Sequence, residues 1–144
     1  MSLPNITWHI SEDGDYIQDT EYYLGSFNSE STIQLNVQVW NNRYGQKSID
    51  SIKDARLAIY FENAEDSILF NYCTISVEEG SAIKPEIELN KVVVNIGELS
   101  GEPNNGIAND KNRINYKNIR ISFENFPRNL KNGIKNMFLD IEID

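Results

Sequence analysis

Apolar and polar side chains alternate along much of this chain, which predicts β-strands that are buried on one face. The pattern is clearest in residues 31–40 and 137–144. The alternating apolar positions are Ile33, Leu35, Val37 and Val39 in the first segment and Met137, Leu139, Ile141 and Ile143 in the second. Further strands are expected at residues 6–10, 56–61, 68–77, 86–96 and 119–123.

Turn-forming residues separate these segments. The alternation changes phase near Asn90–Lys91, and a bulge or tight turn there would account for the change. The connection E-N-A-E-D-S between residues 56–61 and 68–73 predicts a hairpin. No helix longer than two turns is expected. The pattern therefore predicts one all-β domain, residues 1–144, built as an antiparallel two-sheet sandwich of seven to eight strands with immunoglobulin-like or jelly-roll topology.

Composition bears on whether the protein enters a membrane, is secreted or forms disulfides, and on the kind of organism that encodes it. No apolar run approaches the roughly 20 residues of a membrane helix, so no membrane insertion is expected, and no secretory signal is visible. The single cysteine, Cys73, excludes an internal disulfide and leaves the compartment open. Asn and Ile each occur 19 times, a bias typical of AT-rich coding DNA. It points to a low-GC bacterium or its phage.

The formal net charge of −9 is distributed unevenly along the chain. Residues 1–42 carry six acidic residues and no Lys or Arg, whereas residues 111–135 carry seven basic residues and one acidic residue. The overall acidity argues against nucleic acid as a partner. The basic stretch is interpreted first as a solvated face that balances the acidic N-terminal third, and it could orient neighbouring copies in an assembly.

Catalytic and cofactor signatures are lacking in the sequence. His9 is the only histidine and is expected to be a solvent-facing strand residue, and Cys73 lacks a basic neighbour that would activate its thiol. There is no phosphate-binding glycine loop and no dinucleotide fingerprint. The acidic run Glu12–Asp15 is interpreted as a solvated turn in preference to a calcium loop. No cofactor, metal site or catalytic residue is predicted, and a glycosidase with paired carboxylates ranks as the third functional class.

Two sets of side chains are candidate contact residues. Trp40 is out of phase with Val39, so it is expected to point away from the core. An exposed Trp40, with Tyr44, Tyr22 or Tyr23, would form a platform for a sugar ring; the competing interpretation packs Trp40 under a loop or edge. In the predicted hairpin, Tyr60, Leu69, Ala58 and Cys73 fall on the face opposite the core. That face is either covered by the loop at residues 41–54 or forms a protein interface.

In strand number, length and turn spacing the chain resembles immunoglobulin-like and fibronectin-type sandwich modules, and Trp40 lies near the end of the second strand, as the core tryptophan of fibronectin-type modules does. The Asn- and Ile-rich stretches W-N-N-R-Y-G and P-R-N-L-K-N-G-I-K-N-M-F-L-D-I-E look like virion or tail-associated phage modules. The resemblance implies a non-catalytic structural or attachment module of a phage particle or bacterial surface assembly, which contacts other assembly proteins or itself. The alternative is a carbohydrate-binding module that recognises a surface glycan.

Overall fold

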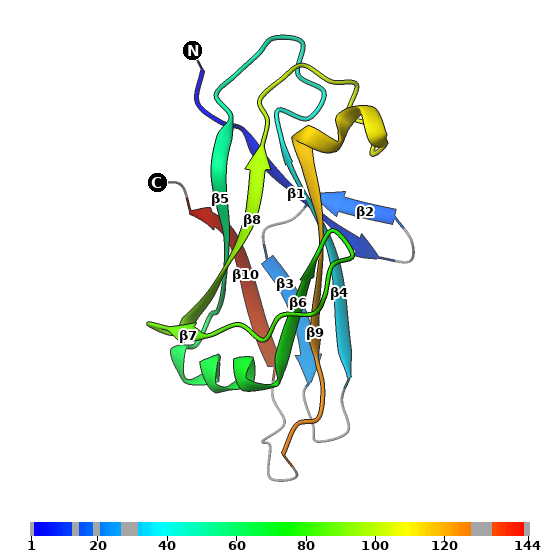
Figure 1. Ribbon diagram of the computed structural model, residues 1–144. Coiled ribbons are helices and arrows are strands. Elements are labelled where there is room, and N and C mark those ends of the chain that lie inside the picture. The colour runs from blue at the N-terminus through cyan, green and yellow to red at the C-terminus, as the bar shows by residue number, and fades with distance from the viewer. Residues whose placement is uncertain (1, 13–14, 19–20, 27–31, 128–133, 143–144) are drawn as a thin grey trace.

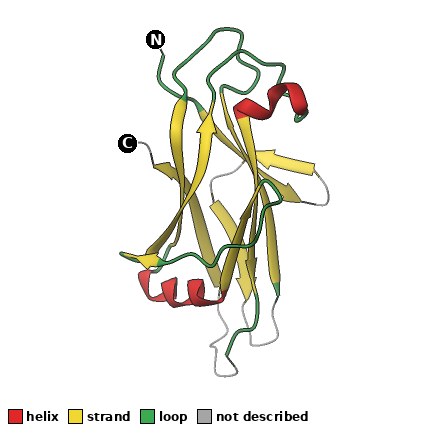
Figure 2. Ribbon diagram, viewed as in Figure 1, coloured by secondary structure: helices red, strands yellow, loops and turns green. Residues whose placement is uncertain are grey.

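Two antiparallel sheets pack face to face in the computed structural model, which describes residues 2–12, 15–18, 21–26, 32–127 and 134–142 (Figure 1). The strands are β1 (Ile6–Glu12), β2 (Asp15–Gln18), β3 (Glu21–Ser26), β4 (Ile33–Asn41), β5 (Ile52–Phe61), β6 (Cys73–Val77), β7 (Ile87–Glu88), β8 (Lys91–Leu99), β9 (Tyr116–Phe123) and β10 (Ile134–Glu142). Two 3-10 helices, η1 (Ala64–Tyr72) and η2 (Asp110–Asn115), lie toward opposite ends of the sandwich (Figure 2).

The order of strands is β2-β1-β4-β9-β6 in one sheet and β3-β10-β5-β8-β7 in the other. From β2 onward every connection crosses to the other sheet, except the hairpin between β7 and β8. Of the two expected topologies, this alternation follows the jelly roll. The prediction of an all-β two-sheet sandwich is confirmed. The described residues contain ten strands where seven to eight were expected, and the short strands β2 and β7 account for the difference.

The core lies between the sheets and is formed by the apolar positions of the alternating strands. Leu35, Val37 and Val39 of β4 are all buried in it, as the period of two predicts. Four phenylalanine rings fill one end with tilted and stacked contacts between 4.9 and 6.4 Å. These rings belong to Phe61, Phe70, Phe123 and Phe126.

The predicted hairpin of residues 56–61 and 68–73 is wrong. Residues 64–72 form η1, which at three residues per turn makes about three turns, so the expectation of no helix longer than two turns is also wrong. Both edges of β5 are occupied, by β8 and by β10, and no edge is left for a hairpin partner. The chain crosses instead to the other sheet, where β6 pairs with β9.

The phase change at residues 90–91 has the predicted cause. Ile87 pairs with Val92 and Glu88 with Lys91, so only two residues turn the chain between β7 and β8. Leu89 and Asn90 have φ angles of 48° and 67°, the left-handed pair that a type I′ hairpin turn requires. The tight turn is confirmed.

Candidate functional site

Five planar side chains lie one against the next on the outer face of the β1-β4-β9 sheet. The rings of Trp40 and Tyr116 are stacked with centroids 4.6 Å apart, because the two residues are register partners on β4 and β9. The guanidinium carbon of Arg43 lies 5.0 Å from the ring centroids of both Trp40 and Tyr44. That of Arg113 lies 5.8 Å from the ring of Tyr116. We call this set the cation–aromatic ladder; each of its Arg contacts is within the range of cation–π attraction.

Trp40 occupies the middle of the ladder and has no exposed surface (0%). Its side chain lies outside the core cluster between the sheets, as its parity predicts. Of the two alternatives for Trp40, the burial of its ring contradicts the sugar platform and agrees with packing beneath neighbouring residues, because Tyr116 and Arg43 cover the ring that a sugar would need. Its indole nitrogen donates to Oε1 of Gln38 at 2.7 Å, so the polar edge of the ring is also occupied. Trp40 is therefore a buried residue that holds Tyr116 and Arg43 in place.

Tyr44 is the exposed aromatic residue at the end of the ladder (63% exposed). Its φ of 62° lies in the left-handed region, which a tyrosine adopts only at a cost in free energy. Its amide N–H donates to Oδ1 of Asn104, and its ring lies so close to Gly106 that a Cβ at that glycine would come within 2.2 Å of it. Tyr22 and Tyr23 pair with Met137 and Asn136 in the other sheet, and their side chains lie outside the described part of the chain.

His9 is buried (6% exposed), so the expectation of a solvent-facing residue is wrong. Nη1 of Arg43 lies 2.9 Å from its Nδ1 and 3.2 Å from its Nε2. A guanidinium only donates, so the ring must be neutral in order to accept. Burial, together with the charge of Arg43, lowers the pKa of His9 to about 4. The histidine is engaged in holding Arg43 in the ladder.

Buried amides hold the two loops that form this end of the sandwich, residues 42–51 and 100–115. The side-chain nitrogen of Asn115 donates to the carbonyl oxygens of Ser100 and Glu102 at 3.0 and 2.8 Å. Asn42 reaches Gly101 at 2.8 Å in the same way, and Asn41 donates to the carbonyl of Leu99 at 3.2 Å. Such buried, satisfied amides fix the loop backbone. From the sequence, the many asparagines were interpreted as a compositional bias and this network was missed, although their clustering in W-N-N-R-Y-G and in residues 104–118 was a visible signal.

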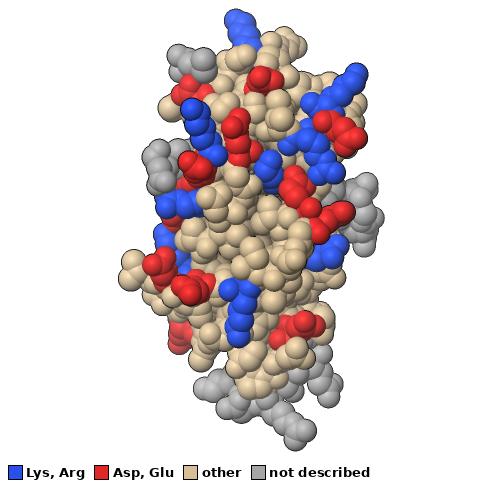
Figure 3. Space-filling view, in the orientation of Figure 1, with Lys and Arg blue, Asp and Glu red and all other residues tan. Residues whose placement is uncertain are grey.

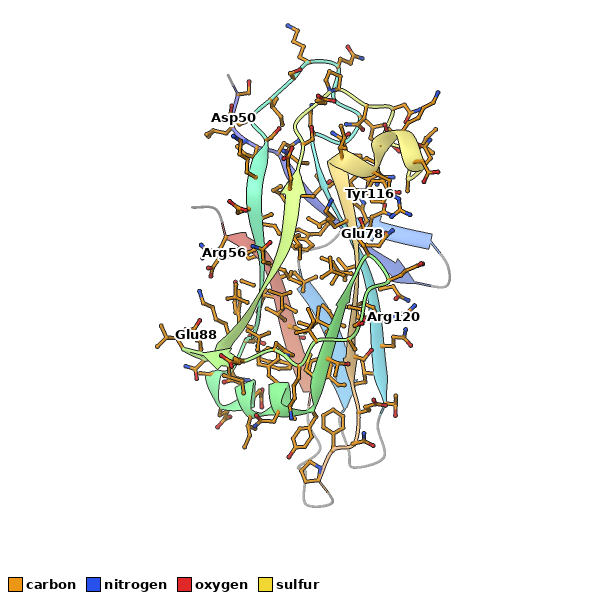
Figure 4. The ribbon with its side chains drawn as sticks, viewed as in Figure 1. Asp50, Arg56, Glu78, Glu88, Tyr116 and Arg120 are labelled. Atoms are coloured by element: carbon orange, nitrogen blue, oxygen red, sulfur yellow. The ribbon has the colours of Figure 1, made fainter. Side chains whose placement is uncertain are left out.

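A groove of about 600 Å³ lies on the outer face of the same sheet, beside the ladder. Its floor is formed by β4, β9 and β6, and its two walls by the turn at residues 79–80 and by the segment from Ala108 to Arg113. Figure 4 shows Arg120 on the side of β9 away from β5 and β8. The polar floor residues are Asn36, Gln38, Ser76, Asn118 and Arg120.

Hydrogen bonds orient the amides of this floor. Nε2 of Gln38 donates to Oδ1 of Asn118 at 3.0 Å, across the register pair of β4 and β9. Nε of Arg120 donates to Oδ1 of its own register partner, Asn36, at 3.4 Å. At the rim, Arg113 forms an ion pair with Glu78 at 2.8 Å.

Of the two alternatives for the hairpin face, a protein interface and cover by the loop at residues 41–54, burial contradicts the interface at three of its four candidate residues. Ala58, Leu69 and Cys73 are all buried, Ala58 on β5 between β10 and β8, Leu69 in η1 and Cys73 at the start of β6 in the other sheet. Tyr60 is the exception, since it is 40% exposed and stacks on Phe138 with the ring centroids 5.4 Å apart. These two rings of the opposite sheet line a second groove of about 410 Å³, to which β1 of the first sheet contributes Ile6 and Trp8.

The remaining candidate residues do not gather into a reactive centre in the described part of the chain. Burial raises the pKa of the Cys73 thiol to about 12, so at neutral pH the thiol is protonated. Within the described ranges, no three His, Cys, Asp or Glu side chains lie close enough to share a metal ion. The acidic run at residues 12–15 lies partly outside the described residues. On the face in Figure 3, acidic and basic side chains are interspersed, and β9, from the basic stretch, lies between β4 and β6.

Comparison with known protein families, curated proteins and solved structures found no match to this chain. No helix among the described residues has the length and apolar character needed to cross a membrane.

Proposed function

We propose that this domain is a non-catalytic attachment module of a larger assembly, a phage particle or a bacterial surface structure, and that it binds its partner in the groove over β4, β9 and β6. The observation that carries the proposal is the combination of a polar floor with a neighbouring loop end fixed by buried amides. A site whose side chains are already oriented loses little conformational entropy when a ligand binds.

The chemistry of the groove favours binding over catalysis. General acid–base or nucleophilic catalysis needs a titratable group placed against a nucleophile or a substrate proton. Among the described groove residues, the charged groups are Arg113, Arg120 and Glu79, and the polar ones are three amides, the hydroxyl of Ser76 and the phenol of Tyr116, whose ring is stacked on Trp40. His9 is engaged by Arg43, and Cys73 is buried. Jelly rolls are also used by viral capsid and lectin domains, which is an analogy at the level of the fold.

Contacts to neighbouring proteins through the opposite sheet are the second candidate. Tyr60 and Phe138 form a stacked and partly exposed aromatic pair there, and aromatic residues are enriched at protein interfaces. This surface retains one of the four residues that the sequence assigned to an interface.

Cosedimentation of the labelled domain with intact cells of low-GC bacteria tests the proposal. Ser76→Trp would fill the groove from its floor, and Lys53→Trp on β5 of the other sheet is the matched control. We expect the wild type and Lys53→Trp to bind, and Ser76→Trp to lose at least tenfold in affinity while melting at a similar temperature. Undiminished binding of Ser76→Trp would contradict the proposal, and loss of binding in Tyr60→Glu instead would favour the second candidate.

A further inference from the structure

We infer that the groove binds an acidic saccharide, whose carboxylate contacts Arg120 and whose ring and hydroxyl oxygens accept hydrogen bonds from the floor. The inference rests on the proposed function and specifies the ligand of the same groove. An acidic saccharide fits because the hydrogen bonds among the floor residues leave mainly donor groups available to a ligand.

The indole N–H of Trp40 determines which atoms of the floor amides donate and which accept. An indole N–H only donates, so Gln38 must present its Oε1 to Trp40 and its Nε2 to Asn118. Asn118 then accepts through Oδ1, which leaves its NH₂ group as the part available to a ligand. This assignment does not depend on the choice between the two orientations of each amide, because the donor-only indole fixes the sequence of donors and acceptors.

Arg120 fixes the second amide in the same way. A guanidinium also only donates, so Asn36 presents its Oδ1 to Nε of Arg120 and keeps its NH₂ group for a ligand. Arg120 is exposed, and no carboxylate among the described residues forms an ion pair with it. Its two terminal nitrogens are therefore available. The floor of the groove thus presents two NH₂ groups and a guanidinium, which only donate, beside the hydroxyl of Ser76, which can donate or accept.

The ligand that complements this floor is rich in acceptors and carries a negative charge. A guanidinium and a carboxylate form two parallel charge-assisted hydrogen bonds, the strongest polar contact that this groove offers. Glu79 on the wall is the one acidic group among the described residues that line the groove. The uncharged hydroxyl donors of the ligand would lie toward Glu79 and its carboxylate toward Arg120, so the two charges also set the direction in which a chain binds.

A saccharide fits the groove better than a peptide. Protein partners generally contribute an apolar centre to an interface, whereas this groove presents mainly amide, hydroxyl and guanidinium groups, with a smaller apolar contribution from Val37, Ala108, Tyr116 and Ile119. The volume of about 600 Å³ lies within the range typical of small-ligand sites. A short oligosaccharide presents oxygen acceptors along its length and needs no apolar pocket.

The test is a titration of ¹⁵N-labelled protein, followed by amide chemical shifts, with trigalacturonate, trimannuronate and triguluronate as probes. The methyl ester of trigalacturonate is the neutral control, and triglutamate is the acidic peptide control. We expect at least one uronate to shift the amides of residues 36–38 and 118–120, with an affinity at least tenfold higher than that of the ester or of triglutamate. Arg120→Gln should weaken that binding at least tenfold, and Lys53→Gln should leave it unchanged.

Equal binding of the ester would overturn the role of the carboxylate, and equal binding of triglutamate would overturn the saccharide in favour of an acidic peptide. If none of the uronates binds, the inference is wrong. The attachment function is judged separately, because the sensitivity of cell binding to Ser76→Trp does not depend on which ligand occupies the groove.

Discussion

Protonation of His9 should destabilise the domain, and the effect can be isolated by comparing the wild type with His9→Gln. The glutamine retains an oxygen that can accept from Arg43, but it does not titrate near neutral pH. In the folded protein the pKa of His9 is about 4, because the ring is buried and lies against the Arg43 guanidinium. In the unfolded chain it returns to the ordinary value of 6.5.

Whether acid stabilises or destabilises the fold depends on which state, folded or unfolded, binds the proton of His9 more tightly. Between pH 6.5 and about 4 the unfolded chain is protonated at His9 while the folded protein is not, so lowering the pH favours unfolding. The contribution of neutral His9 is fully present above pH 6.5 and is lost as the pH falls to about 4. At about 1.4 kcal/mol per pKa unit, a difference of this size corresponds to roughly 3 kcal/mol in the free energy of unfolding.

Urea unfolding of both proteins at intervals from pH 7.5 to 4 measures this difference. Acidic residues titrate in both proteins, so the quantity of interest is the gap between the two free energies of unfolding. We expect the wild type to lose up to about 3 kcal/mol more than His9→Gln across this range. Because His9 is the only histidine, its ring proton resonances also report its pKa directly. Parallel stability curves, or a pKa near 6.5 in the folded protein, would refute the buried, Arg43-engaged histidine.

Three further substitutions test other parts of the structure by urea or thermal unfolding. Leu69→Lys places an unpaired charge in the core and should cost several kcal/mol, whereas a stable variant with impaired association would revive the interface reading. Leu89→Asn should stabilise by about 1 kcal/mol, because Leu89 is 94% exposed in a left-handed conformation that asparagine adopts more readily; no gain would mean that the turn is unstrained. Asn115→Ala should cost about 1–3 kcal/mol by removing the donor to the buried carbonyl of Ser100, and a neutral result would show that the loops do not need this amide.

The strands that could be predicted from the sequence are those that bury one face and therefore alternate apolar and polar residues with a period of two. β4 and β10 each have a buried side and an outer side, and the alternation of their residues is sufficient to identify them. Residues 64–72 failed because a short apolar run such as I-L-F fits both a strand and a helix. The deciding fact is that β10 occupies the edge of β5, and this contact is made by residues more than 70 positions later in the chain.

The candidate site could likewise be predicted only in part, because its contacts depend on how distant strands pair. The parity of Trp40 predicted correctly that it lies outside the core, but not that the ring of Tyr116 would cover it. That contact depends on the register between β4 and β9, which a single sequence does not reveal. Tyr44 was a candidate because of its residue type, and its exposure supports keeping it as one. The groove was missed because Asn36, Gln38, Asn118 and Arg120 look like ordinary solvent-facing residues until their strands are placed side by side.

The alternation of strands between the two sheets also constrains the order in which the chain can fold during synthesis. β10 lies between β3 and β5, so that sheet is divided into two parts until residues 134–142 have been made. In the other sheet, β4 lies between β1 and β9, so one of its edges stays unpaired until β9 has been made. Strand pairings this distant along the chain generally make folding slow, and the unpaired edges remain exposed in the meantime. A ribosome-bound chain that stops before β10 would therefore present the unpaired edges of β3 and β5 to other chains, and such exposed edges favour aggregation.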